Sequence, residues 1–166
     1  MTVVAWATAR NAALQAGFGQ VLAPVMAAIG TAESSLDTRA LNNTPATGDY
    51  SVGVWQINYY GALHAERTRL FGTPAHLLGE TVFGQARAAK TIFNAQGLGA
   101  WSTFTSGAYK AYLHGAKLAP GQETAPVDTA ISPPTEDYSG VIRTAARHYE
   151  TTAGVLTRHA GYLRRI

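Results

Sequence analysis

The sequence predicts a mainly α-helical fold with at most one short β-hairpin. Residues 20–34 and 80–95 place their apolar side chains at helical spacing. Between them, residues 37–52 are rich in Asn, Thr, Pro, Gly and Asp, which is typical of an irregular loop or short hairpin. The 166 residues favour one domain, and 46% hydrophobic with 14% charged residues indicates a packed core.

Helices are expected across residues 5–30, and the first should end at Gly17, because glycine readily adopts the left-handed conformation of a helix C-terminus. A second helix is expected from about Gln20 to Ser34. Pro24 falls near its first turn, where proline is tolerated. Its apolar stripe, expected to face the core, consists of Val21, Leu22, Val25, Met26 and Ile29.

An amphipathic helix is expected at residues 80–95, and Gly97 should terminate it. Its buried stripe comprises Val82, Phe83, Ala86, Ala89, Ile92 and Phe93. A short helix is then expected over Tyr109–His114. We assign residues 1–118 to one folded domain, the Pro-rich residues 119–137 to a linker or strap, and residues 138–166 to a C-terminal helix.

Composition excludes several functional classes. The chain has no cysteine, which rules out a disulfide scaffold, a thiolate zinc site and a Cys nucleophile. The net charge of +3 suits an anionic polymer such as a cell wall, but no Lys/Arg run argues for nucleic acid. No stretch approaches the roughly 18 apolar residues of a membrane-spanning helix, so membrane insertion is not expected. Residues 1–5 lack Lys and Arg, so a signal peptide is not expected.

Metal and esterase chemistry are also not expected. The histidines show no His-x-x-x-His or His-Glu-x-x-His spacing, so we expect no metal site and no cofactor. A Gly-x-Ser-x-Gly nucleophile motif is absent from the sequence.

Glu33 is the carboxylate that the pattern singles out. It follows the apolar stretch Val21–Ile29 and precedes a polar, Gly-containing loop, a setting that the other nine acidic residues lack. Burial beside a low-dielectric wall disfavours the charged form and raises the pKa of a carboxyl group. A raised pKa is what a general acid needs near neutral pH.

A second segment, Asp49–Asn58, begins sixteen residues later and reads Asp-Tyr-Ser-Val-Gly-Val-Trp-Gln-Ile-Asn. Glu33-Ser34 with Ser-x-Gly-Val-Trp-Gln resembles the soluble lytic transglycosylase and goose-type lysozyme group of the lysozyme-like superfamily, over roughly residues 18–113. The Trp-Gln-Ile-Asn form is also similar to segments of phage lysins and tail proteins. The resemblance implies a lysozyme-like (α+β) helical domain that cleaves the β-1,4 bond between N-acetylmuramic acid and N-acetylglucosamine of bacterial peptidoglycan.

The resemblance also implies roles for individual residues. Glu33 would protonate the glycosidic oxygen and then act as the base of the second step. Ser34 would orient that carboxyl or contact the sugar, and Gly53 would let the backbone approach the substrate. Gln56 would make a polar contact at the cleft floor. The substrate-binding residues expected in all are Ser34, Ser51, Gly53, Trp55, Gln56, Asn58, Tyr59 and Tyr109.

Aromatic residues and the later part of the chain depart from the family pattern. Trp55, Tyr59 and Tyr60 either stack on sugars or belong to ordinary packing. The family's Ala-Tyr-Asn-Ala-Gly segment, whose Tyr supports the catalytic Glu, has only Thr103–Tyr109 as its nearest counterpart. Phe104 or Thr105 lies near the expected Tyr in one register, and Tyr109 is a candidate in another. Trp55 replaces the family's Met, which narrows or reshapes the sugar subsite.

Asp49 is the candidate for a second carboxylate, which a hydrolase usually holds about 5–5.5 Å or about 6.5–9.5 Å from the acid. If residues 49–53 are extended, Asp49 and Ser51 share a face. Asp49 could instead cap a turn beside Gly48. With one assured carboxylate, we favour a transglycosylase-type mechanism in which the muramyl sugar supplies the nucleophile.

Two alternatives remain open: a two-carboxylate muramidase, and a non-catalytic wall-binding or structural module of a virion. The expected setting is phage-mediated lysis or wall penetration by a protein that is released through a holin or associated with the virion. The sequence does not determine the oligomeric state.

Overall fold

The computed structural model describes residues 2–113. The expected linker and C-terminal helix, residues 119–166, lie outside the described residues. The α-helices are α1 (Trp6–Gln15), α2 (Gly19–Ser34), α3 (Leu63–Phe71), α4 (Pro74–Gly79), α5 (Val82–Gln96) and α6 (Ser102–Thr105). The strands are β1 (Leu41–Thr44), β2 (Asp49–Val52) and β3 (Ile57–Asn58), and the 3-10 helices are η1 (Pro45–Thr47), η2 (Gly97–Ala100) and η3 (Ala108–Tyr112).

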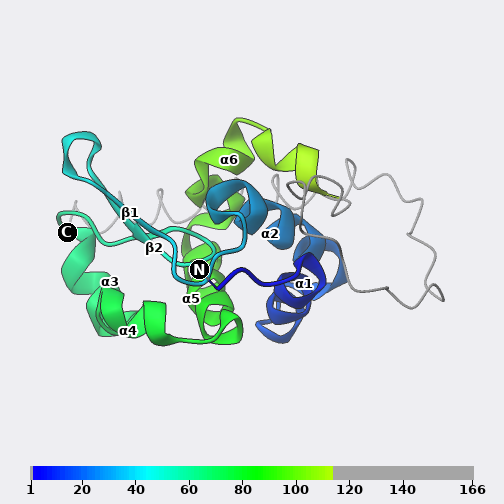
Figure 1. Cartoon of the computed structure of the whole chain (residues 1–166), viewed down its shortest axis with the longest axis horizontal. Helices are drawn as coiled ribbons and strands as arrows, with labels where there is room; N and C mark the ends of the chain where they lie inside the picture. The colour runs from blue at the N-terminus through cyan, green and yellow to red at the C-terminus, as the bar shows by residue number, and fades with distance from the viewer. Residues whose placement is uncertain (1, 114–166) are drawn as a thin grey trace, which may run out of the picture. The chain divides into compact units, whose positions relative to one another are not determined.

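These elements form a mainly helical fold with a small antiparallel sheet, which confirms the predicted fold class. The β1–β2 hairpin, α3 and α4 lie toward one end of the described domain and α1 toward the other, with α2 and α5 between them (Figure 1). No helix in residues 2–113 is long and apolar enough to cross a membrane.

Helix α2 is the central helix of the domain. Residues 25–31 are all buried, so this segment is surrounded on every side and does not present a single apolar stripe. Helix α1, helix α6 and η3 all pack against it. The preceding turn contains Gly17 at φ +90° and Gly19 at φ +75°, which explains why the first helix ends where the sequence predicted.

The sheet contains one strand more than the predicted hairpin. Strands β1 and β2 pair antiparallel, with Asn42 opposite Ser51, and β3 adds to the other edge of β2. A turn between β2 and β3 reverses the chain, with Gly53 at φ +77° and Gln56 at φ +43°. The residues between Gly53 and Gln56 are the apolar Val54 and Trp55, so the sequence pattern gave no sign of a turn.

Helices α3, α4 and α6 were not predicted. Helix α3 has no apolar stripe to reveal it, because Arg67 is its only buried residue. Helix α4 did carry a readable signal: the Thr73 hydroxyl accepts a hydrogen bond from the backbone N–H of His76, and Pro74 occupies the first helical position. The short helix predicted from Tyr109 is the 3-10 helix η3 within the described residues.

Helix α5 agrees with the prediction for residues 80–95. The Thr81 side chain caps its N-terminus, and Gly97, at φ +66°, ends it. The predicted stripe is buried apart from the half-buried Phe83. The same face also buries the polar side chain of Gln85, which is 1% exposed.

Candidate active site

Glu33 lies in the last turn of α2. The helix ends on two consecutive left-handed residues, Ser35 at φ 55° and Leu36 at φ 62°. Their backbone N–H groups donate to the carbonyls of Thr31 and Gly30, and Leu36 is fully buried. Non-glycine residues rarely adopt this conformation, so the packing of Leu36 holds a strained turn next to the carboxylate.

The Glu33 carboxyl is half-buried and accepts a hydrogen bond from a residue seventy positions later in the chain. The Thr103 hydroxyl of α6 donates to Glu33 Oε1 at 2.6 Å. Burial raises the pKa of Glu33, and the charge of Asp49 raises it further, while side-chain and backbone hydrogen bonds from Thr103 oppose the increase. The net pKa shift is upward, in the direction that the sequence predicted.

Ser34 connects α2 to the turn between β2 and β3. Its hydroxyl lies 2.9 Å from the carbonyl oxygen of Val54 and 3.1 Å from that of Gly30. This hydroxyl therefore bonds to backbone carbonyls and not to the Glu33 carboxyl. Its position beside Glu33 supports the local backbone of the site.

Trp55 does not stack on a sugar, because its side chain is fully buried. Its indole N–H donates to the Met26 carbonyl of α2 at 2.9 Å. The ring crosses α2 at Gly30, where a Cβ would lie 3.3 Å from Trp55 Nε1 and 2.7 Å from Val54 Cγ1. The expected stacking role of Trp55 is therefore wrong, and the residue anchors the turn to the central helix.

Gly53 is buried, and the side chain nearest to its Cβ position is that of Gln85. A Cβ at Gly53 would lie 2.6 Å from Gln85 Oε1, which accepts the backbone N–H of Val54 at 2.9 Å. The Gln85 Nε2 donates to the carbonyls of Thr38 and Leu77. A side chain at position 53 would therefore displace Gln85, whereas the approach of the Gly53 backbone to substrate stays a prediction. The Gln56 side chain is half-buried and donates back to the Gly53 carbonyl at 3.0 Å.

Asp49 lies on β2, within a set of polar residues from the hairpin. Its Oδ1 accepts the Ser51 hydroxyl, and its Oδ2 accepts the Asn42 amide at 2.6 Å. Thr44 in turn donates to Asn42 Oδ1 at 2.8 Å. Asp49 and Ser51 do share a face of the strand, as predicted. Ser51 is only 4% exposed, so its hydroxyl serves to orient Asp49.

Two other expected contact residues, Asn58 and Tyr59, make hydrogen bonds within the protein. Asn58 Oδ1 accepts the backbone N–H of Tyr60 at 2.7 Å and that of Tyr50 at 3.4 Å, which fixes the end of β3. Tyr59 is 1% exposed, and its hydroxyl donates to the Gly72 carbonyl at 3.2 Å. Sugar stacking by Tyr59 is therefore excluded, whereas Tyr60 is 42% exposed and open to solvent.

Tyr109 is not the residue that bonds to Glu33. It is 4% exposed, burial raises the pKa of its hydroxyl, and its ring stacks on Phe104 at 4.9 Å between centroids. Thr103 makes the contact instead, from the segment that the resemblance had indicated. Sequence reasoning also missed Asn42 and Gln85, since an isolated polar side chain carries no periodic signal.

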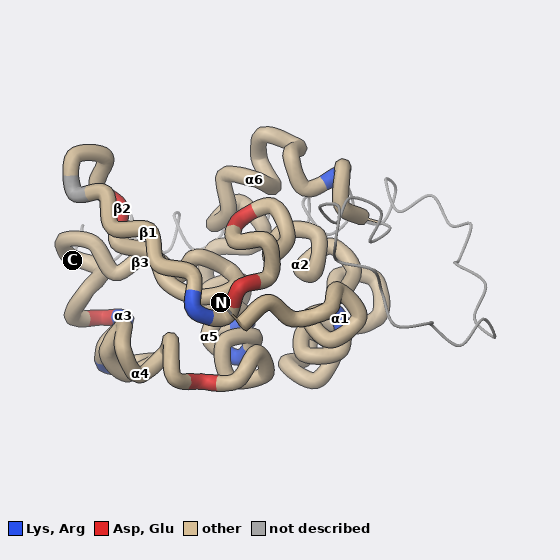
Figure 2. Tube along the Cα trace, in the orientation of Figure 1, with Lys and Arg blue, Asp and Glu red and all other residues tan. Residues whose placement is uncertain are grey.

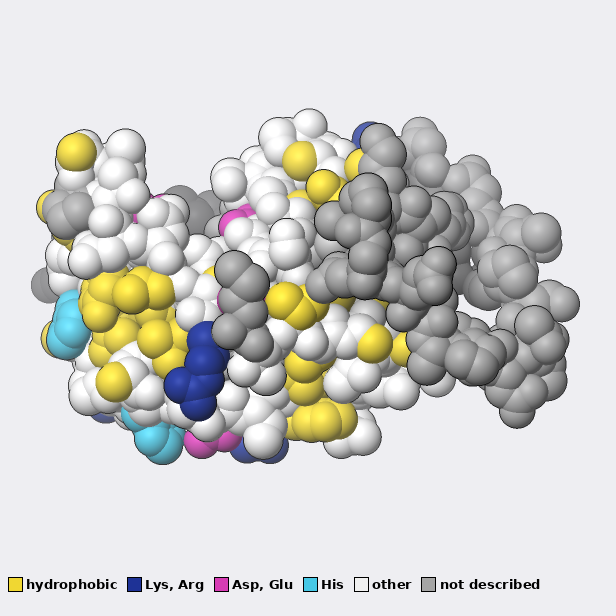
Figure 3. All heavy atoms as spheres, viewed as in Figure 1, with side chains coloured by type: hydrophobic (Ala, Val, Ile, Leu, Met, Phe, Trp, Pro, Cys, Tyr) yellow, Lys and Arg dark blue, Asp and Glu magenta, His cyan; other side chains and the backbone are white. Residues whose placement is uncertain are grey.

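The two carboxylate-bearing elements face a common depression. Acidic positions on β2 and at the end of α2 lie on opposite sides of a gap in the tube view (Figure 2). The space-filling view shows the surface hollowed between the β1–β2 hairpin and the α2–α6 region, with acidic side chains on both sides (Figure 3). Glu33 and Asp49 are the only acidic residues of α2 and β2.

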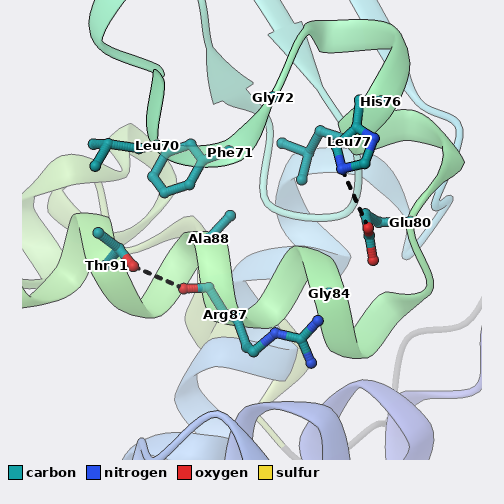
Figure 4. Close-up of a pocket in the computed structure, with 10 residues that line it drawn as sticks. All are labelled: Leu70, Phe71, Gly72, His76, Leu77, Glu80, Gly84, Arg87, Ala88 and Thr91. Atoms are coloured by element: carbon teal, nitrogen blue, oxygen red, sulfur yellow. Dashed lines mark hydrogen bonds and ion pairs between the residues drawn. The ribbon is translucent and has the colours of Figure 1, made fainter. Parts of the chain in front are cut away.

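A separate pocket of about 360 Å³ lies between α3, α4 and α5 (Figure 4). Its wall is apolar at Leu70, Phe71 and Leu77, with the ion pair between His76 and Glu80, 3.4 Å apart, at one side. It contains neither Glu33 nor Asp49. Within residues 2–113, no group of three His, Cys, Asp or Glu side chains is placed to hold a metal ion.

The geometry agrees with the comparison to known families. The family model described as a lysozyme like domain matches residues 10–103, which is more than half of the chain. The protein therefore belongs to the lysozyme-like domain family, and this membership points to activity on peptidoglycan. A comparison with curated proteins found no match.

Proposed function

We propose that this protein is a glycosidase that cleaves the β-1,4 bond between N-acetylmuramic acid and N-acetylglucosamine, with Glu33 as general acid. The observation that carries the proposal is the Glu33 carboxyl itself, which is half-buried, has a pKa raised by that burial, and accepts a hydrogen bond from Thr103. Protonated Glu33 donates its proton to the glycosidic oxygen as the bond to the muramyl C1 breaks. Positive charge then develops on the muramyl ring.

The second step in this proposal is intramolecular. The 6-hydroxyl of the muramyl sugar attacks C1, and the Glu33 carboxylate takes up the hydroxyl proton, which restores the acid and yields a 1,6-anhydro product. The hydrogen bonds on Asp49 support this route, because both of its oxygens accept donors. Hydrogen bonds to a charged oxygen are strong, and Asp49 would have to give them up before it could attack as a nucleophile. Asp49 is then a fixed negative charge that stabilises the positive ring.

A two-carboxylate muramidase is the second candidate, and one observation favours it. The charge of Asp49 raises the pKa of Glu33, so the two groups interact electrostatically. In this mechanism Asp49 assists attack at C1 and water provides the oxygen of the product, which leaves a reducing end.

The proposed setting is phage-mediated lysis or penetration of the wall, by a holin-released or virion-associated protein. Its support is the similarity of Trp55-Gln56-Ile57-Asn58 to segments of phage lysins and tail proteins. A non-catalytic wall-binding module is the competing hypothesis. It predicts sedimentation with peptidoglycan without release of fragments.

Mass spectrometry of fragments from purified peptidoglycan tests the proposal. The full chain, Glu33→Gln, Asp49→Asn and the surface control Glu66→Gln should be compared on walls of several chemotypes. We expect 1,6-anhydro-muramyl ends from the wild type and from Glu66→Gln. Glu33→Gln should lose about 10²–10⁴-fold in rate, the usual contribution of a general acid. Asp49→Asn should retain the anhydro product at a reduced rate.

Other products would change the assignment. Reducing ends, heavier by one water, that disappear in Asp49→Asn would establish the muramidase. Intact peptidoglycan after incubation with folded wild-type protein, on every wall tested, would refute the glycosidase proposal.

A further inference from the structure

We propose that Thr103 is the positioning residue that holds the Glu33 carboxyl in its catalytic orientation, an inference that rests on the proposed function of Glu33. The Thr103 hydroxyl lies 2.6 Å from Glu33 Oε1. This hydrogen bond fixes the plane of the carboxyl, and it becomes stronger when the carboxyl is ionised, because hydrogen bonds to a charged oxygen are stronger than those between neutral groups. With Oε1 bonded to Thr103, Oε2 is left to carry the proton that reaches the substrate.

Thr103 can perform this role because its own backbone is anchored. Trp101, two residues earlier, is 4% exposed, and its indole N–H donates to the Trp55 carbonyl at 2.9 Å. The first turn of α6 begins from the same tryptophan, whose carbonyl accepts the backbone N–H groups of Phe104 and Thr105. The position of Thr103 is therefore set by a buried side chain and not by an exposed loop.

The Thr103 hydroxyl should have a measurable effect on the pKa of Glu33. Helix α6 carries no titratable side chain. Of the other elements packed on α2, η3 contributes the buried Tyr109, the exposed Lys110 and the half-buried Tyr112, and α1 contributes the half-buried Arg10. Burial and the β2 residue Asp49 both raise the pKa of Glu33, and Thr103 opposes them. Loss of the Thr103 hydroxyl should therefore raise the pKa of Glu33 further.

The test compares Thr103→Val, which removes the hydroxyl at similar size, with Thr103→Ser, which keeps it. Thr105→Val is the matched control, because Thr105 lies on the same helix and its hydroxyl donates only to the Ser102 carbonyl. Carbon-13 NMR of glutamate-labelled full-length protein reports the Glu33 pKa, with the resonance assigned through Glu33→Gln. The rate of peptidoglycan cleavage, measured as a function of pH, gives the pKa of the group that acts as the acid in catalysis.

We expect a higher Glu33 pKa in Thr103→Val, and near wild-type values in Thr103→Ser and Thr105→Val. In Thr103→Val the alkaline limb of the rate profile should move upward with the pKa. Its kcat should fall about tenfold with little change in KM, the size expected for one hydrogen bond to a charged group.

A Thr103→Val protein with the wild-type pKa, pH profile and kcat would overturn the inference. The titration needs no substrate, so it separates this inference from the proposed function. A shifted pKa in a protein that cleaves no peptidoglycan would support the coupling of the two residues and refute the glycosidase assignment.

Discussion

The indole nitrogen of Trp101 lies 2.9 Å from the carbonyl oxygen of Trp55, whose own indole nitrogen lies 2.9 Å from the carbonyl oxygen of Met26. Both tryptophans are buried. These two consecutive hydrogen bonds join α2, the turn between β2 and β3, and the start of α6, and we call the three connected segments the tryptophan frame. Glu33 and Thr103 belong to two of the connected segments, so the same frame supports both ends of their hydrogen bond.

Trp101→Phe should weaken this frame. The substitution leaves the Trp55 carbonyl without its buried donor, which costs about 1–3 kcal/mol for an unsatisfied group. Because α6 loses its anchor, we also expect a lower kcat on peptidoglycan. Urea unfolding and steady-state rates measure the two effects. A variant with full stability but a lower rate would show that the bond positions α6 without stabilising the domain.

Gly30→Ala should destabilise the domain. A Cβ at this position would lie 2.7 Å from Val54 Cγ1 and 3.2 Å from Leu36 Cδ2. Overpacking of this kind typically costs about 1–3 kcal/mol, against a helix-propensity gain of about 1 kcal/mol. Gly79→Ala is the control, because nothing lies within 4 Å of its Cβ position. Equal midpoints of denaturant unfolding for the two variants would contradict the expected clash.

Gln85→Leu should be costly although it replaces an amide with an apolar group of similar size. The substitution leaves the Val54 N–H without its acceptor and removes the donor to Thr38 and Leu77. Each buried group left unpaired costs about 1–3 kcal/mol, so we expect a loss of at least about 2 kcal/mol. The exposed Gln96→Leu on the same helix should change little. A thermally stable Gln85→Leu would mean that the turn finds other partners.

Glu33→Gln should stabilise the folded protein at neutral pH. The pKa of Glu33 is raised above its ordinary value of 4.5, so the folded state binds the proton more tightly than the unfolded state. Stability therefore falls as pH rises from 4.5 to the folded pKa, and the loss persists above it. Glutamine never ionises, so its advantage should be present at pH 7 and absent below about pH 4.

Chemical unfolding of wild type and Glu33→Gln at several pH values measures this difference. Glu66→Gln, on the exposed surface of α3, provides the control. A Glu33→Gln variant that is less stable than the wild type at pH 7 would show that the bond to Thr103 outweighs the cost of burial.

Local amino-acid patterns were sufficient to predict the helical class, the two long helices and the position of Glu33 at the end of the first of them. Helical spacing over residues 20–34 and 80–95 is a local property that survives in the folded state. An apolar helix that ends on a carboxylate also predicts partial burial and hence the direction of the Glu33 pKa shift. These conclusions required no knowledge of which segments meet.

Long-range packing, in contrast, sets which polar residues contact Glu33 and Asp49. Thr103 and Asn42 contact these carboxylates through chain reversals that no periodic pattern encodes. The two aromatic residues also differ in burial: Trp55 lies in the core beneath the site, whereas Tyr60 is exposed. An aromatic residue has the same sequence signature in both settings. Whether it packs in a core or faces a substrate depends on long-range packing, which is fixed only when the whole domain assembles.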